Sequence, residues 1–215
     1  MATPKQAERR TRERRTRGRP ARSPEQIADM RSHISACALR LFQEEGYAAI
    51  SMRRLAQEAG CTAMTLYKYF DTKIDILRTL WADVFDELFD GLEQIAARHS
   101  EPVARLNAVA TGYVSYWLEH REHYFMVFMS GGVSQSDVVG FVSDAALLAR
   151  FEMLRTHLDC ALGGDTDAKE LRLKTDLLLC ALNGIAHNLI TINGYPWSDP
   201  EKLVRQATGG LLATR

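Results

Sequence analysis

The chain has 215 residues, of which 46% are apolar and 25% are charged, a composition typical of a soluble globular protein with a sizeable core. Alternating apolar and polar positions are almost absent, and no apolar run is long enough to cross a membrane. The zero net charge hides an asymmetry, because residues 1–73 hold 15 Lys and Arg against 8 Asp and Glu, whereas residues 74–215 hold 12 against 19. A basic end on an acidic body indicates that only one end meets a polyanion.

The first 22 residues are predicted to be a disordered basic arm. They contain nine Lys and Arg, two acidic residues and no aliphatic side chain larger than Met1, so they cannot bury a core. The arm is either a solvated run of charge or a segment that follows DNA phosphates or enters a minor groove, with Arg17 and Arg19 as the groove residues. No apolar run follows at signal-peptide distance, so the sequence predicts a cytoplasmic protein.

A first helix is predicted to begin at Ser23-Pro24, an N-cap followed by proline at the first helical position. Gly46 is predicted to end this helix. Its apolar residues recur at spacings of three and four, as expected for a face that packs on a core: Ile27, Met30, Ile34, Cys37, Ala38, Leu41 and Phe42.

Residues 51–73 are predicted to form two short helices joined by a tight turn. Ser51 is suited to cap the first helix, and Gly60 to the left-handed residue that ends it. Thr62 is suited to cap the second helix, in which Leu66 and Phe70 form the buried stripe. This spacing is that of a helix-turn-helix.

The same stretch carries a resemblance to a known family. The residues that match are Ala59-Gly60-Cys61-Thr62, Thr65-Leu66-Tyr67-Lys68-Tyr69-Phe70 and Lys73, together with the preceding helix and its Glu45-Gly46-Tyr47 ending. This pattern resembles the DNA-binding domain of TetR-family transcriptional regulators. The resemblance implies an all-α protein, with an N-terminal three-helix helix-turn-helix domain at residues 23–73 and a helical ligand-binding and dimerisation domain at residues 74–215.

Several residues of this domain are predicted to contact DNA. Tyr67, Lys68 and Tyr69 suit phosphate donors, as the matching positions do in the family, although either tyrosine could be a core aromatic. Lys73 opens a helix, where a cation is unfavourable to the helix dipole, so its presence favours a phosphate partner. Further contacts with the DNA backbone are expected from Ser51, Arg53 and Thr62. Contacts with base edges are expected from Ala63, Met64 and Thr65.

The rest of the chain is also predicted to be helical. Apolar periodicity predicts helices at residues 74–95, 103–120, 124–129, 138–162 and 167–192, and a last helix begins at Pro200. Residues 177–192 are apolar almost all round, which fits a helix covered by its own chain on one side and by a second copy on the other. The resemblance implies dimerisation through residues 167–192 and 200–212.

Residues 103–162 are unusually rich in aromatic residues and methionine, which are either plain core or the lining of an apolar ligand site. The resemblance favours a site for a small-molecule inducer between these helices. Its predicted lining residues are Tyr113, Trp117, Phe125, Phe128, Met129, Phe151, His157, Asn183 and His187.

Catalysis is not predicted, because the sequence contains no HExxH, no nucleophile elbow and no glycine-rich phosphate loop. His120 and His123 could bind a metal, but no third ligand is evident, so capping or solvation is favoured and neither a metal nor a cofactor is expected. The four cysteines lack C-x-x-C spacing and are predicted to be buried reduced thiols: Cys37, Cys61, Cys160 and Cys180.

These features predict a ligand-responsive, homodimeric DNA-binding transcriptional regulator. In this hypothesis a repressor leaves a palindromic operator on double-stranded DNA when a small apolar or amphipathic molecule tilts the helix at residues 74–95. The alternative is a DNA-binding dimer without a small ligand, regulated by a protein partner or by its own concentration.

Overall fold

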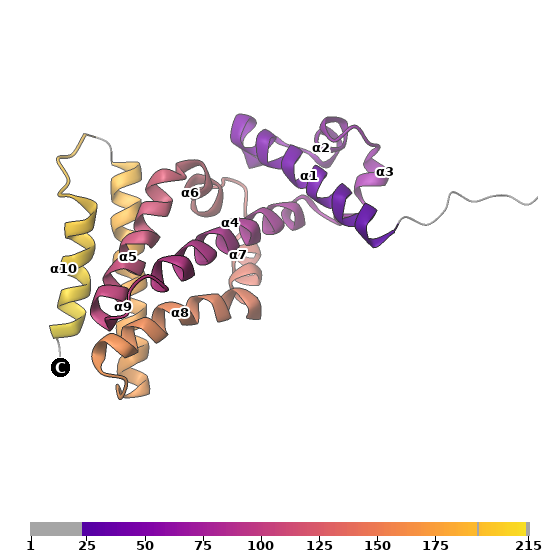
Figure 1. Cartoon of the computed structure of the whole chain (residues 1–215). Helices are drawn as coiled ribbons and strands as arrows, with labels where there is room; N and C mark the ends of the chain where they lie inside the picture. The colour runs from indigo at the N-terminus through magenta and orange to yellow at the C-terminus, as the bar shows by residue number, and fades with distance from the viewer. Residues whose placement is uncertain (1–22, 193, 214–215) are drawn as a thin grey trace, which may run out of the picture.

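The computed structural model describes residues 23–192 and 194–213, so the predictions for the basic arm, Arg17 and Arg19 lie outside the described residues. Within these ranges every regular element is helical, which confirms the all-α class. The elements are α1 (Pro24–Glu45), η1 (Tyr47–Ala49), α2 (Met52–Glu58), α3 (Ala63–Leu66), α4 (Lys73–Ala96), α5 (Pro102–Glu119), α6 (Arg121–Phe128), α7 (Gln135–Val142), α8 (Ala145–Leu162), α9 (Ala168–Thr191) and α10 (Pro200–Ala213) (Figure 1).

The elements α1 to α3, here called the head, pack around a small apolar core. Ser23 begins α1 with a capping box, in which its hydroxyl accepts from the Gln26 backbone N–H and the Gln26 side chain accepts from the Ser23 N–H. Ile34, Leu55 and Leu66, one from each helix, are completely buried. The short helices α2 and α3, of 7 and 4 residues, are therefore stabilised by apolar contact with α1 rather than by their own length.

The helix α4 joins the head to the remaining helices, here called the body (Figure 1). Thr72 caps it and forms a capping box with Asp75. Its buried side chains recur along one face, including Leu77 beside the head and Leu88 and Leu92 in the body. One continuous apolar stripe thus packs against both parts of the molecule.

The helix α5 lies at the centre of the body, because it packs against α4, α8, α9 and α10. Its Leu106, Val109 and Trp117 are completely buried. The last helix, α10, lies beside α5 and α9 (Figure 1), where the Thr208 hydroxyl donates to the Asn107 side-chain oxygen.

One helix prediction is wrong, because residues 138–162 do not form a single helix. They belong to α7 and α8, which are separated at Ser143 and Asp144. The Asp144 carboxylate accepts hydrogen bonds from the backbone N–H groups of Ala146 and Leu147, at 2.8 and 3.1 Å. An N-cap inside an otherwise helical run starts a new helix there.

The prediction that all four cysteines are buried is also wrong. Cys37 is buried and Cys61 half-buried, but Cys160 on α8 and Cys180 on α9 are exposed. None of the four forms a disulfide. Cys180 borders a hollow between α9 and α10.

Candidate nucleic-acid interface

The turn between α2 and α3 has the predicted helix-turn-helix geometry. The Ser51 hydroxyl caps α2 by accepting from the Arg54 N–H, and the Thr62 hydroxyl caps α3 by accepting from the Thr65 N–H. Between the two helices Gly60 adopts a φ of 64°, the left-handed conformation that glycine tolerates best. Local backbone chemistry therefore sets the angle between the helices.

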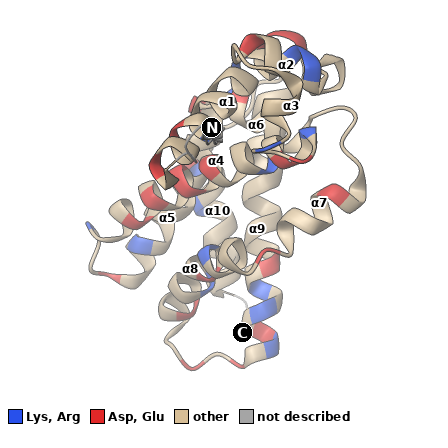
Figure 2. Cartoon of the chain, turned by 90° about the vertical axis from the view of Figure 1, so that its right-hand side faces the viewer, with Lys and Arg blue, Asp and Glu red and all other residues tan. Residues whose placement is uncertain are grey.

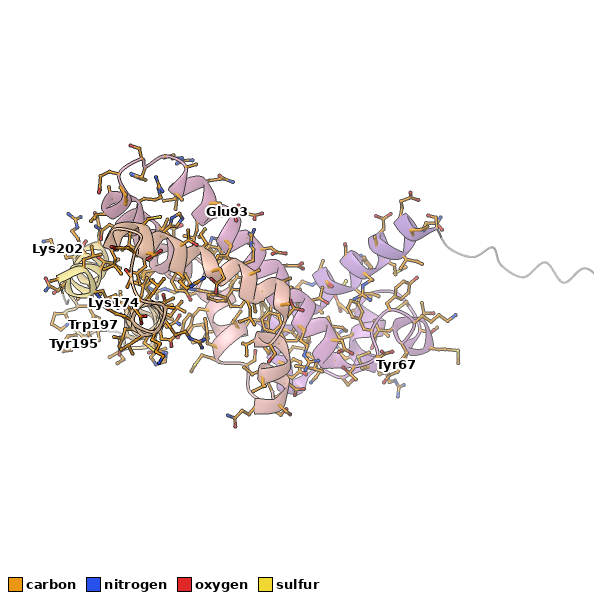
Figure 3. All side chains as sticks on the ribbon, turned by 90° about the horizontal axis from the view of Figure 1, so that it is seen from below. Tyr67, Glu93, Lys174, Tyr195, Trp197 and Lys202 are labelled. Carbon is orange, nitrogen blue, oxygen red and sulfur yellow. The ribbon has the colours of Figure 1, made fainter. Side chains whose placement is uncertain are left out.

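The helix α3 presents a polar and apolar surface at the far end of the head. Met64 is 77% exposed and Tyr67 is 51% exposed. Tyr67 lies at the end of the molecule opposite Tyr195 and Trp197 (Figure 3). The other predicted contact residues on this surface are exposed (Ser51, Arg53, Thr62, Lys68) or half-buried (Ala63, Thr65).

Tyr69 does not lie on this surface, contrary to the prediction. The helix α3 ends at Leu66, and the following tight turn leaves Tyr69 only 8% exposed. The Arg31 guanidinium of α1 donates to the Tyr69 carbonyl oxygen and lies over the Phe70 ring, 4.2 Å from its centre. Tyr69 is therefore a core aromatic, the alternative that its sequence left open.

Lys73 has a different role in this structure from the predicted phosphate contact. Its Nζ donates to the carbonyl oxygens of Tyr47 and Ile50, at 2.6 and 2.7 Å, and it lies over the Tyr47 ring. The side chain is half-buried. Two of its three donors are thus used inside the protein, which satisfies two loop carbonyls and fastens η1 to the first turn of α4.

Other charges of the head are paired with one another. Glu58 accepts from Arg54 at 2.8 Å and from Arg40, and Arg54 also meets Glu45 at 3.2 Å. These hydrogen bonds, first from Arg54 and then from Arg40, hold the pKa of the Glu58 carboxyl below its usual value. Arg53, which precedes Arg54 on α2, is exposed. Residues 23–73 hold six Lys and Arg and six Asp and Glu, so the basic excess of residues 1–73 comes from residues 1–22, which lie outside the described residues. On the described helices acidic and basic residues are interspersed (Figure 2).

The predicted ligand residues do not line a common cavity. Tyr113 and Trp117 are 1% and 0% exposed, and Phe151 packs on Phe89 with ring centres 4.9 Å apart. These three are core residues. Burial raises the pKa of Tyr113 to about 12, so its neutral hydroxyl donates to the Asn183 side-chain oxygen at 2.8 Å.

The other predicted ligand residues border separate hollows or are exposed. Phe125 and Met129 line a hollow of about 390 Å³ between α6 and the head. His157 borders another of about 600 Å³ near the α4–α5 connection, and Phe128 is exposed. His187 is exposed and its Nδ1 lies 2.8 Å from the Tyr124 hydroxyl.

A cavity of about 460 Å³ lies between α4, α7 and α8, where sequence analysis predicted no site. Its lining is mixed, with apolar walls and charged groups, and consists of Arg78, Thr79, Ala82, Phe85, Asp86, Gly140, Phe141, Asp144, Ala146, Leu147 and Arg150. The volume is in the range of small-molecule sites. The sequence did not identify these residues as a site for two reasons. Phe85 belongs to the apolar stripe that predicts core, and the helix break that forms one wall was not predicted.

Comparison with known proteins supports the helix-turn-helix assignment in the head. The family described as bacterial regulatory proteins, tetR family, matches residues 34–80. The transcriptional repressor KstR2 of Mycolicibacterium smegmatis is 25% identical over 119 residues, which are 55% of this chain and 58% of that protein. The transcriptional regulator HbdR of Aromatoleum sp. is 24% identical over 157 residues, 73% of this chain and 66% of that protein. The chain thus spans less than two thirds of either relative.

The fold of the whole described chain is also found in solved structures. The fatty acid degradation regulator FadR from Bacillus halodurans superimposes with a TM-score of 0.66 at 17% identity, over 90% of this chain and 97% of that one. Among the described helices, none has the length and apolar character needed to span a membrane. Residues 34–80, which contain the helix-turn-helix, are thus those of the tetR family of bacterial regulatory proteins, and the described chain shares the fold of a solved bacterial regulator.

Proposed function

We propose that the chain is a repressor that binds a palindromic DNA site as a homodimer and leaves it when a small apolar or amphipathic molecule binds the body. The observation that carries this proposal is the surface of α3, where Met64 and Tyr67 are exposed at the far end of the head. A large apolar side chain and a phenol on the surface, beside a capped tight turn, suit contact with another molecule better than with water.

The contacts with DNA divide into two kinds. Ala63, Met64 and Thr65 form the first turn of α3 and would face base edges, with Met64 suited to a thymine methyl group. Tyr67 and Lys68 would donate to phosphate oxygens beside them. Ser51, Arg53 and Thr62 would add contacts with the DNA backbone. Tyr69 and Lys73 have no part in this proposal, because their side chains are used inside the head.

The second copy is proposed to bind along α9 and α10. Leu177 on α9 is 50% exposed although it belongs to an apolar helix. Small residues line the joint between these helices, among them Ala181 and Gly184 on α9 and Ala207 on α10. Such residues allow close approach of two further helices. Two heads related by a two-fold axis match the symmetry of a palindromic site.

The ligand is proposed to bind in the 460 Å³ cavity between α4, α7 and α8. Phe85 and Phe141 offer apolar rings whose centres are 6.0 Å apart, and Arg78 and Asp144 offer polar groups. Arg78 on α4 also donates to the Asp137 carbonyl oxygen on α7, at 3.2 Å. A ligand that separated α7 from α4 would act on the helix that leads to the head.

The experiment is a fluorescence-anisotropy titration of the full chain with DNA from upstream of its own gene and with random duplex, at two salt concentrations. We expect the upstream DNA to bind at least a hundredfold more tightly. Tyr67→Phe should weaken that binding by about tenfold or more, because a hydrogen bond to a charged phosphate is lost.

Tyr195→Phe is the matched control, because this tyrosine is 60% exposed at the other end of the molecule. Its DNA affinity should equal that of the unmodified chain. Equal and weak binding of both DNAs, abolished by salt, would contradict the proposal and point to non-specific charge attraction.

A further inference from the structure

The junction of α5 and α6 brings together two histidines and a glutamate. His120 is the single residue between these helices, with a non-helical φ of −112° and ψ of 60°. His123 lies on the first turn of α6, and the two imidazole rings are almost parallel, at 12°, with centres 5.3 Å apart. One ligand atom from each of His120, Glu122 and His123 lies within 4.8 Å of the other two.

We propose that His120, Glu122 and His123 bind a divalent transition-metal ion such as Zn²⁺. Two imidazole nitrogens and one carboxylate oxygen, with a position left for water, form a donor set that zinc uses, whereas Mg²⁺ and Ca²⁺ prefer oxygen donors alone. The spacing of the two histidines in the sequence indicates no third ligand. The helix break at His120 provides one, because it brings Glu122 into reach of both rings.

The side chains can close around an ion without a change of fold. Metal–ligand bonds of about 2.0–2.1 Å place tetrahedral ligand atoms about 3.3 Å apart, so the three groups need to approach one another slightly. His120 and His123 are half-buried and Glu122 is exposed. The His120 Nδ1 and the nearer Glu122 oxygen are 3.8 Å apart, which is longer than a hydrogen bond, so neither group satisfies the other.

Tyr116 supports the site from α5. Its hydroxyl oxygen lies 3.1 Å from His123 Nδ1, and also 3.3 Å from the Val84 carbonyl oxygen and 3.4 Å from a Glu87 carboxylate oxygen. Histidine ligands usually donate their second ring N–H to such a partner, which fixes the ring. His123 would therefore bind the ion through Nε2, with its Nδ1–H donated to Tyr116. The Tyr116 ring also packs on His120, with ring centres 4.6 Å apart.

The position of the site links it to the head. The helix α6 packs against α1 and against α4, and Glu122 also borders the hollow between α6 and the head. An ion bound at its first turn would hold α6 to the end of α5. We therefore expect Zn²⁺ to change DNA affinity, a consequence that rests on the function proposed above, whereas the metal site does not.

The site is tested with the full chain, carrying no polyhistidine tag, by competition for Zn²⁺ against a chromogenic chelator. We expect one ion per chain. His120→Ala, His123→Ala and Glu122→Gln should each weaken binding at least tenfold, and Tyr116→Phe, which keeps the ring, should weaken it about 10–100-fold. The control is His99→Ala, between α4 and α5, which should leave binding unchanged.

Circular dichroism of each variant confirms that it is folded, and Glu122→Gln is an exposed, isosteric change that preserves packing. Absence of stoichiometric Zn²⁺ binding, or equal affinity in Glu122→Gln and the unmodified chain, would overturn the site. DNA titration with and without Zn²⁺ is the second measurement. Stoichiometric Zn²⁺ binding with unchanged DNA affinity would overturn the link to the head and leave the site standing.

Discussion

The Lys73 ammonium group lies over the Tyr47 ring, 4.0 Å from its centre, and donates to the carbonyl oxygen of the same residue at 2.6 Å. Lys73 is the first residue of α4, and Tyr47 begins η1 after α1. The contact therefore joins the start of the long connecting helix to the loop before the helix-turn-helix. A movement of α4 would reach the head through this contact.

Lys73→Met tests this structural role. The substitution keeps the apolar stem and removes the ammonium group, so two loop carbonyls lose a charged donor. We expect the free energy of unfolding to fall by about 1–3 kcal/mol, measured by urea denaturation. Unchanged stability together with weaker DNA binding would instead support the phosphate contact predicted from the sequence.

Glu58 predicts a pH dependence of stability. Its pKa is lowered in the folded protein by hydrogen bonds from Arg54 and then Arg40, so the unfolded chain binds a proton more readily. Its stabilising effect is present above the ordinary pKa of 4.5 and is lost as the pH falls through the lower folded value. Glu58→Gln should therefore lower stability at pH 7 and lose less stability on acidification than the unmodified chain.

The measurement is denaturant unfolding from pH 7 to pH 3, with Glu44→Gln as the control. Glu44 is exposed near the end of α1. Its variant should follow the unmodified chain at every pH. Parallel profiles of the Glu58→Gln variant and the unmodified chain would contradict the prediction.

Gly184→Arg tests the proposed dimer. A Cβ at Gly184 on α9 meets nothing within 4 Å, so the isolated chain can accept the arginine, whereas a second copy packed on α9 cannot. We expect sedimentation velocity to give a dimer for the unmodified chain and a folded monomer for this variant. Gly91→Arg on α4 is matched, because its Cβ is equally free, and it should remain dimeric. Dissociation of both variants would show a general effect of added charge instead.

Ala82→Trp tests the cavity between α4, α7 and α8. Ala82 lines this cavity, so an indole there would occupy the space in which the ligand is proposed to bind. The apolar anionic dye 1-anilinonaphthalene-8-sulfonate serves as a probe, and its affinity should fall at least tenfold, because the cavity is its expected site. The substitution lies outside the head and removes none of the proposed DNA contacts.

Ala104→Trp, an exposed alanine on α5 that lies outside this cavity, is the control and should bind the dye as the unmodified chain does. Equal dye affinity in Ala82→Trp and the unmodified chain would mean that the dye binds elsewhere.

The sequence by itself determined the helices and the helix-turn-helix, because their signals are local. Ser51 and Thr62 cap helices through backbone groups three residues away, and Gly60 supplies a conformation that no neighbour has to impose. The apolar stripe of α4 was likewise predicted from the helical spacing of its apolar residues. The helix break at Asp144 was missed, since one capping carboxylate in an apolar run leaves the periodicity almost unchanged.

Only the tertiary structure decided which polar and aromatic side chains are available for function. Tyr67 and Tyr69 are equivalent in the sequence, yet one is exposed and the other buried, because the chain leaves α3 after Leu66. Lys73 meets carbonyl oxygens that lie 26 and 23 residues before it. Helical periodicity is a property of neighbouring residues, whereas the partner of a polar group depends on how distant elements pack. The packing of distant elements therefore determines which side chains are available at the candidate site.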